Sequence, residues 1–257
     1  MILPSQRDLF DIPRDTIYLN AAYMTPATNR MEEIGRAALE SLKHPWKVGA
    51  EDFFIETEKT RTMAGALFGV NAETIAFIPS ASYGISTAAR NIVVNQGDVI
   101  LLLEGQFPSN VYAWYDVARD KGAEIVTVKA PADYDWTSAI LDCLDRVGER
   151  LALAALANVH WSNGALIDLE KIAPIVRANG AALVLDLTQS LGAMKTNIGT
   201  IDPDFAVTAG YKWLFGPYST GFVYVAERHH SGQPLEQNWI TRAGSQDFAR
   251  LVNYRDE

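Results

Sequence analysis

The chain is poor in the residues on which several classes of protein depend. It has one cysteine, Cys143, and four histidines in 257 residues. A single cysteine cannot form a disulfide within the chain, and its context "AILDCLDRV" is typical of the apolar face of a helix. The histidines are His44, His160, His229 and His230, and their positions show no metal-ligand spacing. The sequence therefore predicts no metal site.

Positive charge and long apolar runs are also scarce. Lys and Arg number 22 against 31 Asp and Glu, which gives a formal net charge of -9. Binding to nucleic-acid phosphates is not expected without clustered basic residues. The longest apolar stretches, such as "LALAALA" at 151–157, are far shorter than the roughly 20 residues that span a bilayer. With no signal peptide at the N-terminus, we expect a cytoplasmic protein with neither nucleic-acid nor membrane partners.

Three motifs of common α/β enzymes are missing as well. The chain has no G-x-G-x-x-G dinucleotide fingerprint, no P-loop and no G-x-S-x-G elbow. These absences weigh against a nicotinamide dehydrogenase and against a serine hydrolase.

What the chain does contain is a regular alternation of short apolar runs and helix-length segments. Its hydrophobic content of 48% is enough for a core. Several runs are apolar throughout, as expected for strands of a sheet that is covered on both faces. The pattern predicts an α/β fold with a mostly parallel seven-stranded sheet flanked by helices. The predicted strands are 74–79, 99–104, 124–128, 151–157, 181–186, 205–209 and 221–226.

Helices are predicted between the strands from their capping residues. The segment 109–121 is followed by a glycine, and Ser109 is its predicted N-cap. The segment 169–179 has Asp168 as its predicted N-cap, and Pro174 is expected to delay or bend the first turns.

Candidate site residues are those that follow each strand, because ligands in open α/β sheets bind beyond the carboxyl ends of the strands. After the first strand, Ser80, Ala81 and Ser82 open a helix whose amides and dipole favour a phosphate. Plain capping by one of the serines is the alternative. After the second strand, Phe107 precedes a proline in a rigid turn, where it could pack in the core or stack on a planar ligand.

An acidic residue ends the fifth strand in an apolar context. A carboxylate at Asp186 is costly unless a cation or hydrogen-bond donors meet it. The alternative is a cap for the next helix. Gln189, three residues further on, could reach the same ligand or face solvent.

A lysine follows the sixth strand in "AGYKWLFGP". Tyr211, Trp213 and Phe215 are expected to restrict the stem of Lys212 and to dry its surroundings. Such a setting lowers the pKa of an amine and prepares it to attack a carbonyl. A solvated lysine is the alternative.

One small molecule needs all of these groups, and it is pyridoxal 5'-phosphate (PLP). Its aldehyde requires an amine, its pyridine nitrogen requires a carboxylate, and its phosphate suits a helix N-terminus. The sequence therefore predicts PLP as the cofactor.

The motifs that carry this chemistry resemble those of a known family. "LVLDLTQSLGA" at 183–193 and "GYKWLFGPYSTGFVYV" at 210–225 are similar to stretches of the class V aminotransferase family of fold type I PLP-dependent enzymes. Kynureninases, isopenicillin N epimerase and cysteine desulfurases belong to that family. The likeness begins at "YLNAAYMTPAT", residues 18–28, and so extends over nearly the whole chain.

The resemblance implies roles for individual residues. Asp186 pairs with the pyridine nitrogen, Gln189 contacts the ring hydroxyl, and Lys212 forms the internal aldimine and acts as the catalytic residue. The other implied cofactor contacts are Ala81, Ser82 and Tyr211 at the phosphate, Phe107 on the ring, and Trp161 and Asn163 near the ring hydroxyl. Asn20 and Ala21 are expected either to line the substrate pocket or to form a structural turn.

The activity implied is that of an aminotransferase-like enzyme acting on an amino acid or related amine. A lyase or epimerase of the same family and a non-catalytic protein of the same fold are the alternatives. Cysteine desulfuration is not expected, because Cys143 lies early in the chain within a predicted helix. The resemblance also implies a homodimer, and it divides the chain into an N-terminal segment (1–20), a PLP-binding domain (21–228) and the start of a truncated C-terminal region (229–257).

Overall fold

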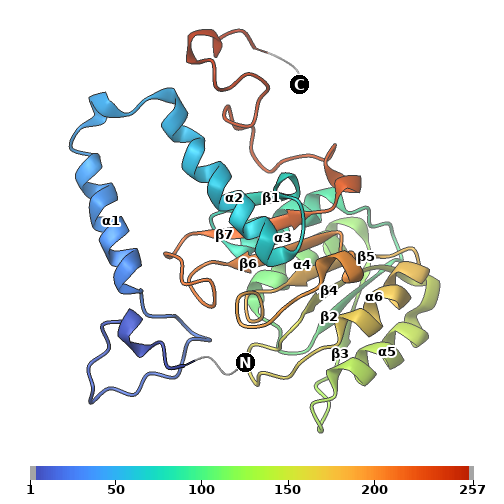
Figure 1. Cartoon of the computed structure of the whole chain (residues 1–257). Helices are drawn as coiled ribbons and strands as arrows, with labels where there is room; N and C mark the ends of the chain where they lie inside the picture. The colour runs from blue at the N-terminus through green and yellow to red at the C-terminus, as the bar shows by residue number, and fades with distance from the viewer. Residues whose placement is uncertain (1–3, 255–257) are drawn as a thin grey trace.

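The chain folds around one seven-stranded sheet, shown by a computed structural model that describes residues 4–254 (Figure 1). The strand order is β1-β7-β6-β5-β4-β2-β3. β7 runs antiparallel to its neighbours β1 and β6, and the other pairs are parallel. The strands are β1 (Ile75–Ile78), β2 (Val99–Leu103), β3 (Glu124–Val128), β4 (Leu151–Ala157), β5 (Ala182–Asp186), β6 (Phe205–Ala209) and β7 (Gly221–Val225). The predicted sheet is confirmed to within one residue at each strand end.

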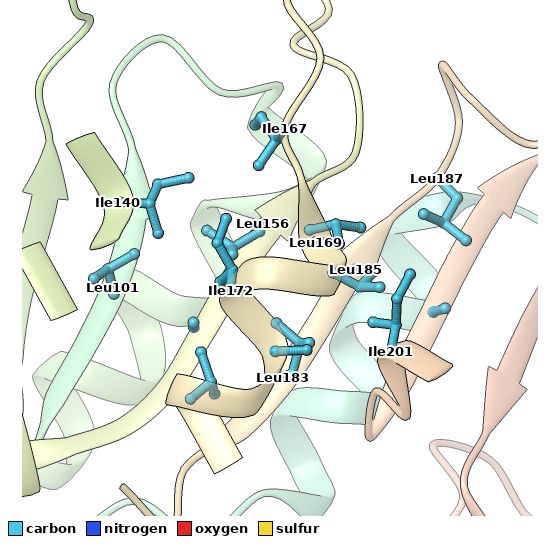
Figure 2. Close-up of a cluster of buried hydrophobic side chains, with 14 of the residues drawn as sticks. Leu101, Ile140, Leu156, Ile167, Leu169, Ile172, Leu183, Leu185, Leu187 and Ile201 are labelled. Atoms are coloured by element: carbon cyan, nitrogen blue, oxygen red, sulfur yellow. The ribbon is translucent and has the colours of Figure 1, made fainter. Parts of the chain in front are cut away.

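Helices cover both faces of the sheet, which explains why the central strands are apolar throughout. One face packs against α2 (Ile55–Phe68), α5 (Trp136–Val147), α6 (Leu169–Ala178) and α7 (Ile198–Ile201). Figure 2 shows part of this layer, where Ile172 of α6 meets Leu156 and Leu183 of the sheet. The other face packs against α3 (Ala81–Asn91) and α4 (Tyr112–Lys121). Each fully buried Leu or Ile stabilises this arrangement by about 1.5–3 kcal/mol.

The start of α4 differs from the prediction. The helix begins at Tyr112, its N-cap residue is Val111, and a short 3-10 turn at Pro108–Asn110 precedes it. Pro108 takes the first position of this turn, where its missing N–H costs no hydrogen bond. Val111, with φ of −130°, separates the turn from the helix. The predicted cap, Ser109, lies inside the turn and accepts a hydrogen bond from the hydroxyl of Ser82 at 2.9 Å.

The start of α6 agrees with its predicted cap. Asp168 Oδ1 accepts the amide of Lys171 at 3.2 Å, and the helix begins at the next residue, Leu169. Pro174 lies inside the helix and does not delay it. A proline at this position costs one helical bond, to the carbonyl of the exposed Glu170, which water can satisfy.

The N-terminal part of the chain extends away from the sheet (Figure 1). It contains α1 (Asn29–Ser41), which begins where Thr28 Oγ1 accepts the amide of Met31 at 3.1 Å. No residue of α1 is buried. After β7, the described chain has only short 3-10 turns and is held by ring contacts among Phe53, Trp239 and Phe248.

Between residues 4 and 254, no helix has both the length and the apolar composition that a bilayer crossing requires. The same part of the chain holds no group of three or more His, Cys, Asp or Glu side chains arranged to bind a metal ion.

Candidate functional site

The carboxyl ends of the parallel strands surround a cavity of about 230 Å³. Its walls come from the segments that follow β1, β2, β4, β5 and β6, and from the segment that precedes the antiparallel β7. Of the predicted cofactor-binding residues, all but Asn163 line this cavity. The fold therefore brings together groups that are up to 131 positions apart in the sequence, Ala81 and Lys212.

The N-terminus of α3 forms one end of the cavity. Ser80 Oγ accepts the amide of Tyr83 at 3.2 Å, so Ser80 is the capping serine. This leaves the hydroxyl of Ser82 beside that of Ser109, with both residues on the cavity wall. Free amides in the first helical turn, the helix dipole and two hydroxyls together favour an anion.

Asp186 ends β5 and is only 7% exposed. Its Oδ1 accepts the amide of Thr188 at 2.9 Å. Burial raises the pKa of Asp186, while the hydrogen bonds from Thr188 and the charge of Lys212 act in the opposite direction. The next helix, α7, starts only at Ile198, so the alternative of a helix cap is wrong.

Lys212 is also buried, with 6% of its surface exposed. Among residues 4–254, no hydrogen bond or ion pair is formed by its Nζ, which lies 5.5 Å from the ring centroid of Phe107 and 5.8 Å from that of Tyr211. Burial lowers the pKa of Lys212, and the attraction of Asp186 only partly offsets this effect. Among residues 4–254, the site thus contains a buried amine with no hydrogen bond or ion pair and a buried carboxylate that is hydrogen-bonded to Thr188 but has no ion pair.

The aromatic surroundings of Lys212 differ in part from the prediction. Tyr211 is near the amine as expected, but Trp213 donates its indole N–H to Gln189 Oε1 at 2.9 Å. Phe215 is 43% exposed and packs against Phe10, with 5.9 Å between ring centroids. Consecutive side chains on a tight loop point in different directions, so the second ring at the amine comes from Phe107, which follows β2.

The loop that carries Lys212 closes on itself through a glycine. Gly210 donates its amide to the carbonyl of Thr220 at 2.7 Å and accepts the amide of Gly216 at 2.9 Å. A Cβ atom at residue 210 would lie 2.8 Å from Thr220 Oγ1 and 3.0 Å from the Thr220 carbonyl oxygen. A glycine is needed at residue 210 because the two ends of the loop, at Gly210 and Thr220, approach so closely. The carbonyl of Lys212 is further fixed by the hydroxyl of Thr25 at 2.6 Å.

Gln189 lines the cavity with its amide held at both ends. Nε2 donates to the carbonyl of Ala22 at 2.9 Å, and Oε1 accepts the indole N–H of Trp213. The alternative of a solvent-facing Gln189 is therefore wrong. Asn20 and Ala21 do not line the cavity themselves, although they adjoin Ala22.

The segment after β4 contributes one of its two predicted residues. Trp161 lines the cavity and donates its indole N–H to the carbonyl of Gly105 at 2.8 Å. Asn163 is exposed, and its side-chain oxygen accepts the amide of Ala165 at 3.0 Å. Asn163 thus stabilises its own turn.

Sequence reasoning missed several residues of the cavity wall, among them Gln106, Ser109, His160, Thr188 and Tyr218. Gln106, Ser109, His160 and Thr188 carried a signal, because each lies within two positions of a predicted site residue. Tyr218 carried none, because it is six positions from Lys212 and reaches the cavity only through the fold of its loop. Gln106 Oε1 is buried and lacks a hydrogen-bond partner within the part of the chain that the structure describes.

Comparison with known proteins gives the family. The sequence pattern described as "Aminotransferase class-V" matches residues 46–238. The chain belongs to the class-V aminotransferase family.

Two curated relatives show how far the likeness extends. A kynureninase of Deinococcus radiodurans is 27% identical over 96% of this chain and 61% of its own length. A probable cysteine desulfurase of Methanothermobacter thermautotrophicus is 27% identical over 83% of this chain and 54% of its own length. The chain thus spans somewhat more than half the length of these relatives.

Solved structures share the fold at lower identity. The apo cysteine desulfurase of Thermococcus onnurineus superposes with a TM-score of 0.71 at 20% identity, covering 83% of this chain and 54% of that one. A mutant of C-DES, described with glycine covalently linked to the PLP cofactor, gives a TM-score of 0.75 at 18% identity, covering 84% and 58%.

PLP is the cofactor of this family, and the cavity has the donor set that PLP requires. The phosphate matches the N-terminus of α3 with its paired hydroxyls. The pyridine nitrogen matches Asp186, a buried carboxylate with no ion pair among residues 4–254. The aldehyde matches the unbonded amine of Lys212.

Proposed function

We propose that this chain is the cofactor-binding part of a PLP-dependent enzyme that acts on an amino acid or related amine. The observation that carries the proposal is that Lys212 and Asp186 line the same cavity. Both groups are buried, and neither has an ionic hydrogen-bond partner in the described chain. Burying two such charges is costly, and a ligand with a reactive carbonyl and a basic ring nitrogen would relieve both costs.

The residues that would hold PLP follow from the chemistry of the cavity. Lys212 would bind the aldehyde carbon, and Asp186 would keep the ring nitrogen protonated. The first turn of α3, with Ser82 and Ser109, would hold the phosphate. Phe107 lines the same cavity and can cover the ring. When bound, PLP acts as an electron sink that acidifies bonds to the α-carbon of the substrate.

Proton transfer falls to Lys212. Because burial lowers the pKa of its amine, a larger fraction of Lys212 is neutral and able to accept a proton than for an exposed lysine. With its amine free, Nζ would take the proton from the α-carbon of the substrate and later return it. The rings of Phe107 and Tyr211 near Nζ limit access of water during this transfer.

We favour lyase-type cleavage of the amino acid over transamination. The support comes from the names of the relatives, which include kynureninases, a probable cysteine desulfurase and a cystine C–S lyase. Desulfuration has no support from the cysteine of this chain. Cys143 is 3% exposed within α5, it does not line the cavity, and burial raises the pKa of its thiol. Cleavage that needs no thiol and uses Lys212 to carry the proton fits the cavity better.

We also propose that the protein is a homodimer. α1 has no buried residue, and its apolar side chains Ile34 and Leu39 are 53% and 68% exposed. A second copy packed around α1 would cover these side chains. Sedimentation of the purified protein at several concentrations tests this; a monomer at every concentration contradicts it.

The cofactor hypothesis is tested by mixing the purified chain with PLP. We expect a visible absorption band that becomes permanent after borohydride reduction, with the added mass on the tryptic peptide that contains Lys212. The band should be lost in Lys212→Ala and kept in Lys195→Ala, which removes an exposed lysine. Absence of the band from the unmodified chain would reject the proposal.

The reaction class is tested next with a panel of amino acids. Transamination would bleach the band in proportion to the keto acid formed, whereas cleavage would release product over many turnovers while the band returns. A band that no amino acid changes would favour a cofactor-binding protein without activity.

A further inference from the structure

Phe107 lies on a turn that is held by hydrogen bonds and a ring contact from the loop that follows a neighbouring strand. The turn follows β2 and contains Glu104, Gly105 and Gln106 before Phe107. The loop after β4, which pairs with β2 in the sheet, brings His160 and Trp161 beside it. Two successive carbonyls of the turn thus meet two successive side chains of the loop.

His160 holds the first carbonyl. Its Nε2 lies 3.1 Å from the carbonyl oxygen of Glu104, which can only accept, so Nε2 carries the proton. Nδ1 lies 3.0 Å from the hydroxyl of Ser162. The imidazole also stacks on Trp136, with 4.7 Å between centroids and 9° between planes. With 3% of its surface exposed, His160 is fixed at its edges and on one face.

Trp161 holds the second carbonyl and also touches the aromatic ring itself. Its indole N–H donates to Gly105 at 2.8 Å. Its ring meets that of Phe107 edge to face, at 5.4 Å and 86°, an arrangement that aromatic pairs prefer. On the cavity side, the Phe107 ring lies 5.5 Å from Lys212 Nζ.

These contacts from His160 and Trp161 matter because burial does not fix the position of Phe107. It is 36% exposed, and Gly105 before it has φ of +65°, in the left-handed region that only glycine adopts freely. A turn of this kind has several accessible conformations. The bonds to Glu104 and Gly105 select one of them, and the edge of Trp161 then sets the tilt of the ring.

We propose that His160 and Trp161 are positioning residues that orient Phe107 over the cavity before a ligand enters. They act through the carbonyls of Glu104 and Gly105 and through the ring contact. The inference rests on the proposed function only in naming PLP as the planar ligand that Phe107 covers. It assigns to Trp161 a role that does not require contact with the ligand.

The first test is a double-mutant cycle on PLP affinity. Trp161→Phe keeps a ring beside Phe107 but removes the indole donor, and Phe107→Leu removes the covering ring. We expect each change to raise the PLP dissociation constant about tenfold, and the double variant to be no more than about twofold weaker than Phe107→Leu alone. Independent losses, about a hundredfold together, would overturn the inference.

Trp239→Phe is the matched control for the cycle. Trp239 is as exposed as Trp161, at 45%, but lies in the ring cluster with Phe53 and Phe248. Its replacement should leave PLP affinity unchanged. A loss of affinity equal to that of Trp161→Phe would show a general effect of removing a tryptophan and would overturn the inference.

The second test needs no PLP. In the NMR spectrum of the chain alone, the indole proton of Trp161 should exchange with solvent at least tenfold more slowly than that of Trp239, for which the structure gives no hydrogen bond within residues 4–254. Equal rates would show that the hydrogen bond from Trp161 to Gly105 does not form and would overturn the inference. Slow exchange in a chain that shows no PLP band would support this hydrogen bond and reject the proposed function, so the two failures are distinguishable.

Discussion

Two buried aspartates at opposite ends of neighbouring strands have opposite surroundings. Asp204 directly precedes β6. Its carboxylate accepts hydrogen bonds from Arg228 Nε at 2.8 Å, from His229 Nε2 at 2.7 Å and from the amide of Leu183 at 2.8 Å. Asp186 ends β5 at the cavity, where it accepts hydrogen bonds from Thr188 and forms no ion pair within residues 4–254. The two residues are similarly shielded from water, at 8% and 7% exposure.

The pKa values of the two carboxyls move in opposite directions. Burial acts to raise the pKa of both. At Asp204, the bonds from Arg228, His229 and Leu183 outweigh burial and lower the pKa below its usual value. At Asp186, burial prevails and the pKa is raised. A structural carboxylate therefore has its partners within the fold, whereas a carboxylate without them indicates a site where a ligand supplies the cation.

The largest effect that tests this comparison of the two aspartates is expected on PLP affinity when Asp186 is changed. Asp186→Asn should weaken PLP binding by about 100- to 1,000-fold, because an amide cannot pair with a protonated pyridine nitrogen in a buried site. The free energy of unfolding of the chain without PLP should not fall, since the variant buries no charge. Titration of the visible band and urea unfolding give the two values. Unchanged affinity in a folded variant would contradict the assignment of Asp186.

The matched change at the other aspartate should have the reverse outcome. Asp204→Asn leaves Arg228 and His229 without their carboxylate, so the free energy of unfolding should fall by about 2–3 kcal/mol. PLP affinity of the folded variant should be within about twofold of the original, because Asp204 lies at the amino end of β6 and the cavity lies at the carboxyl ends of the strands. If Asp204→Asn instead lost cofactor affinity without losing stability, the division between the two ends of the sheet would be wrong.

The dependence of stability on pH should also separate the two residues. A carboxyl whose pKa is raised on folding stabilises the chain fully below its unfolded pKa, 3.8 for Asp186, and loses that contribution as the pH rises through the folded value. The lowered pKa of Asp204 gives the opposite sign: its contribution is present above 3.8 and is lost as the pH falls through the folded value.

Urea unfolding at a series of pH values measures both contributions by difference. Relative to the unmodified chain without PLP, Asp186→Asn should gain stability as the pH rises from about 4 towards neutrality. The deficit of Asp204→Asn should shrink as the pH falls below about 4. Parallel profiles for the two variants would show that the carboxyls are not shifted in opposite directions.

The smallest effect is expected at Cys143, which belongs to neither end of the sheet. Cys143→Ala should lower the free energy of unfolding by about 1 kcal/mol, because it removes a buried sulfur from the core beneath α5. The PLP band and its response to amino acids should not change. Loss of turnover in this variant would revive a cysteine-dependent mechanism.

The fold was largely predictable from the sequence, and so were eight of the 20 residues that line the cavity. The predicted strands are confirmed because short runs rich in apolar and β-branched residues, bounded by turn residues, favour strands. Asp186 and Lys212 could be found because each stands directly after such a run, where the chain must reach the cavity edge. The ring at the lysine amine was assigned to its sequence neighbours Trp213 and Phe215, whereas the fold brings Phe107 there.

By itself, the sequence determined which residues follow each strand, and with them the chemical groups at the edge of the sheet. Only the tertiary structure decided how those groups meet. The pairing of Ser82 with Ser109, the grip of His160 and Trp161 on the turn of Phe107, and the partners of Asp204 all join separate strands or loops. The local sequence pattern predicts whether a few residues form a strand, a helix or a turn. Contacts between separate segments depend instead on which strands become neighbours in the sheet, and packing of the whole core sets that order.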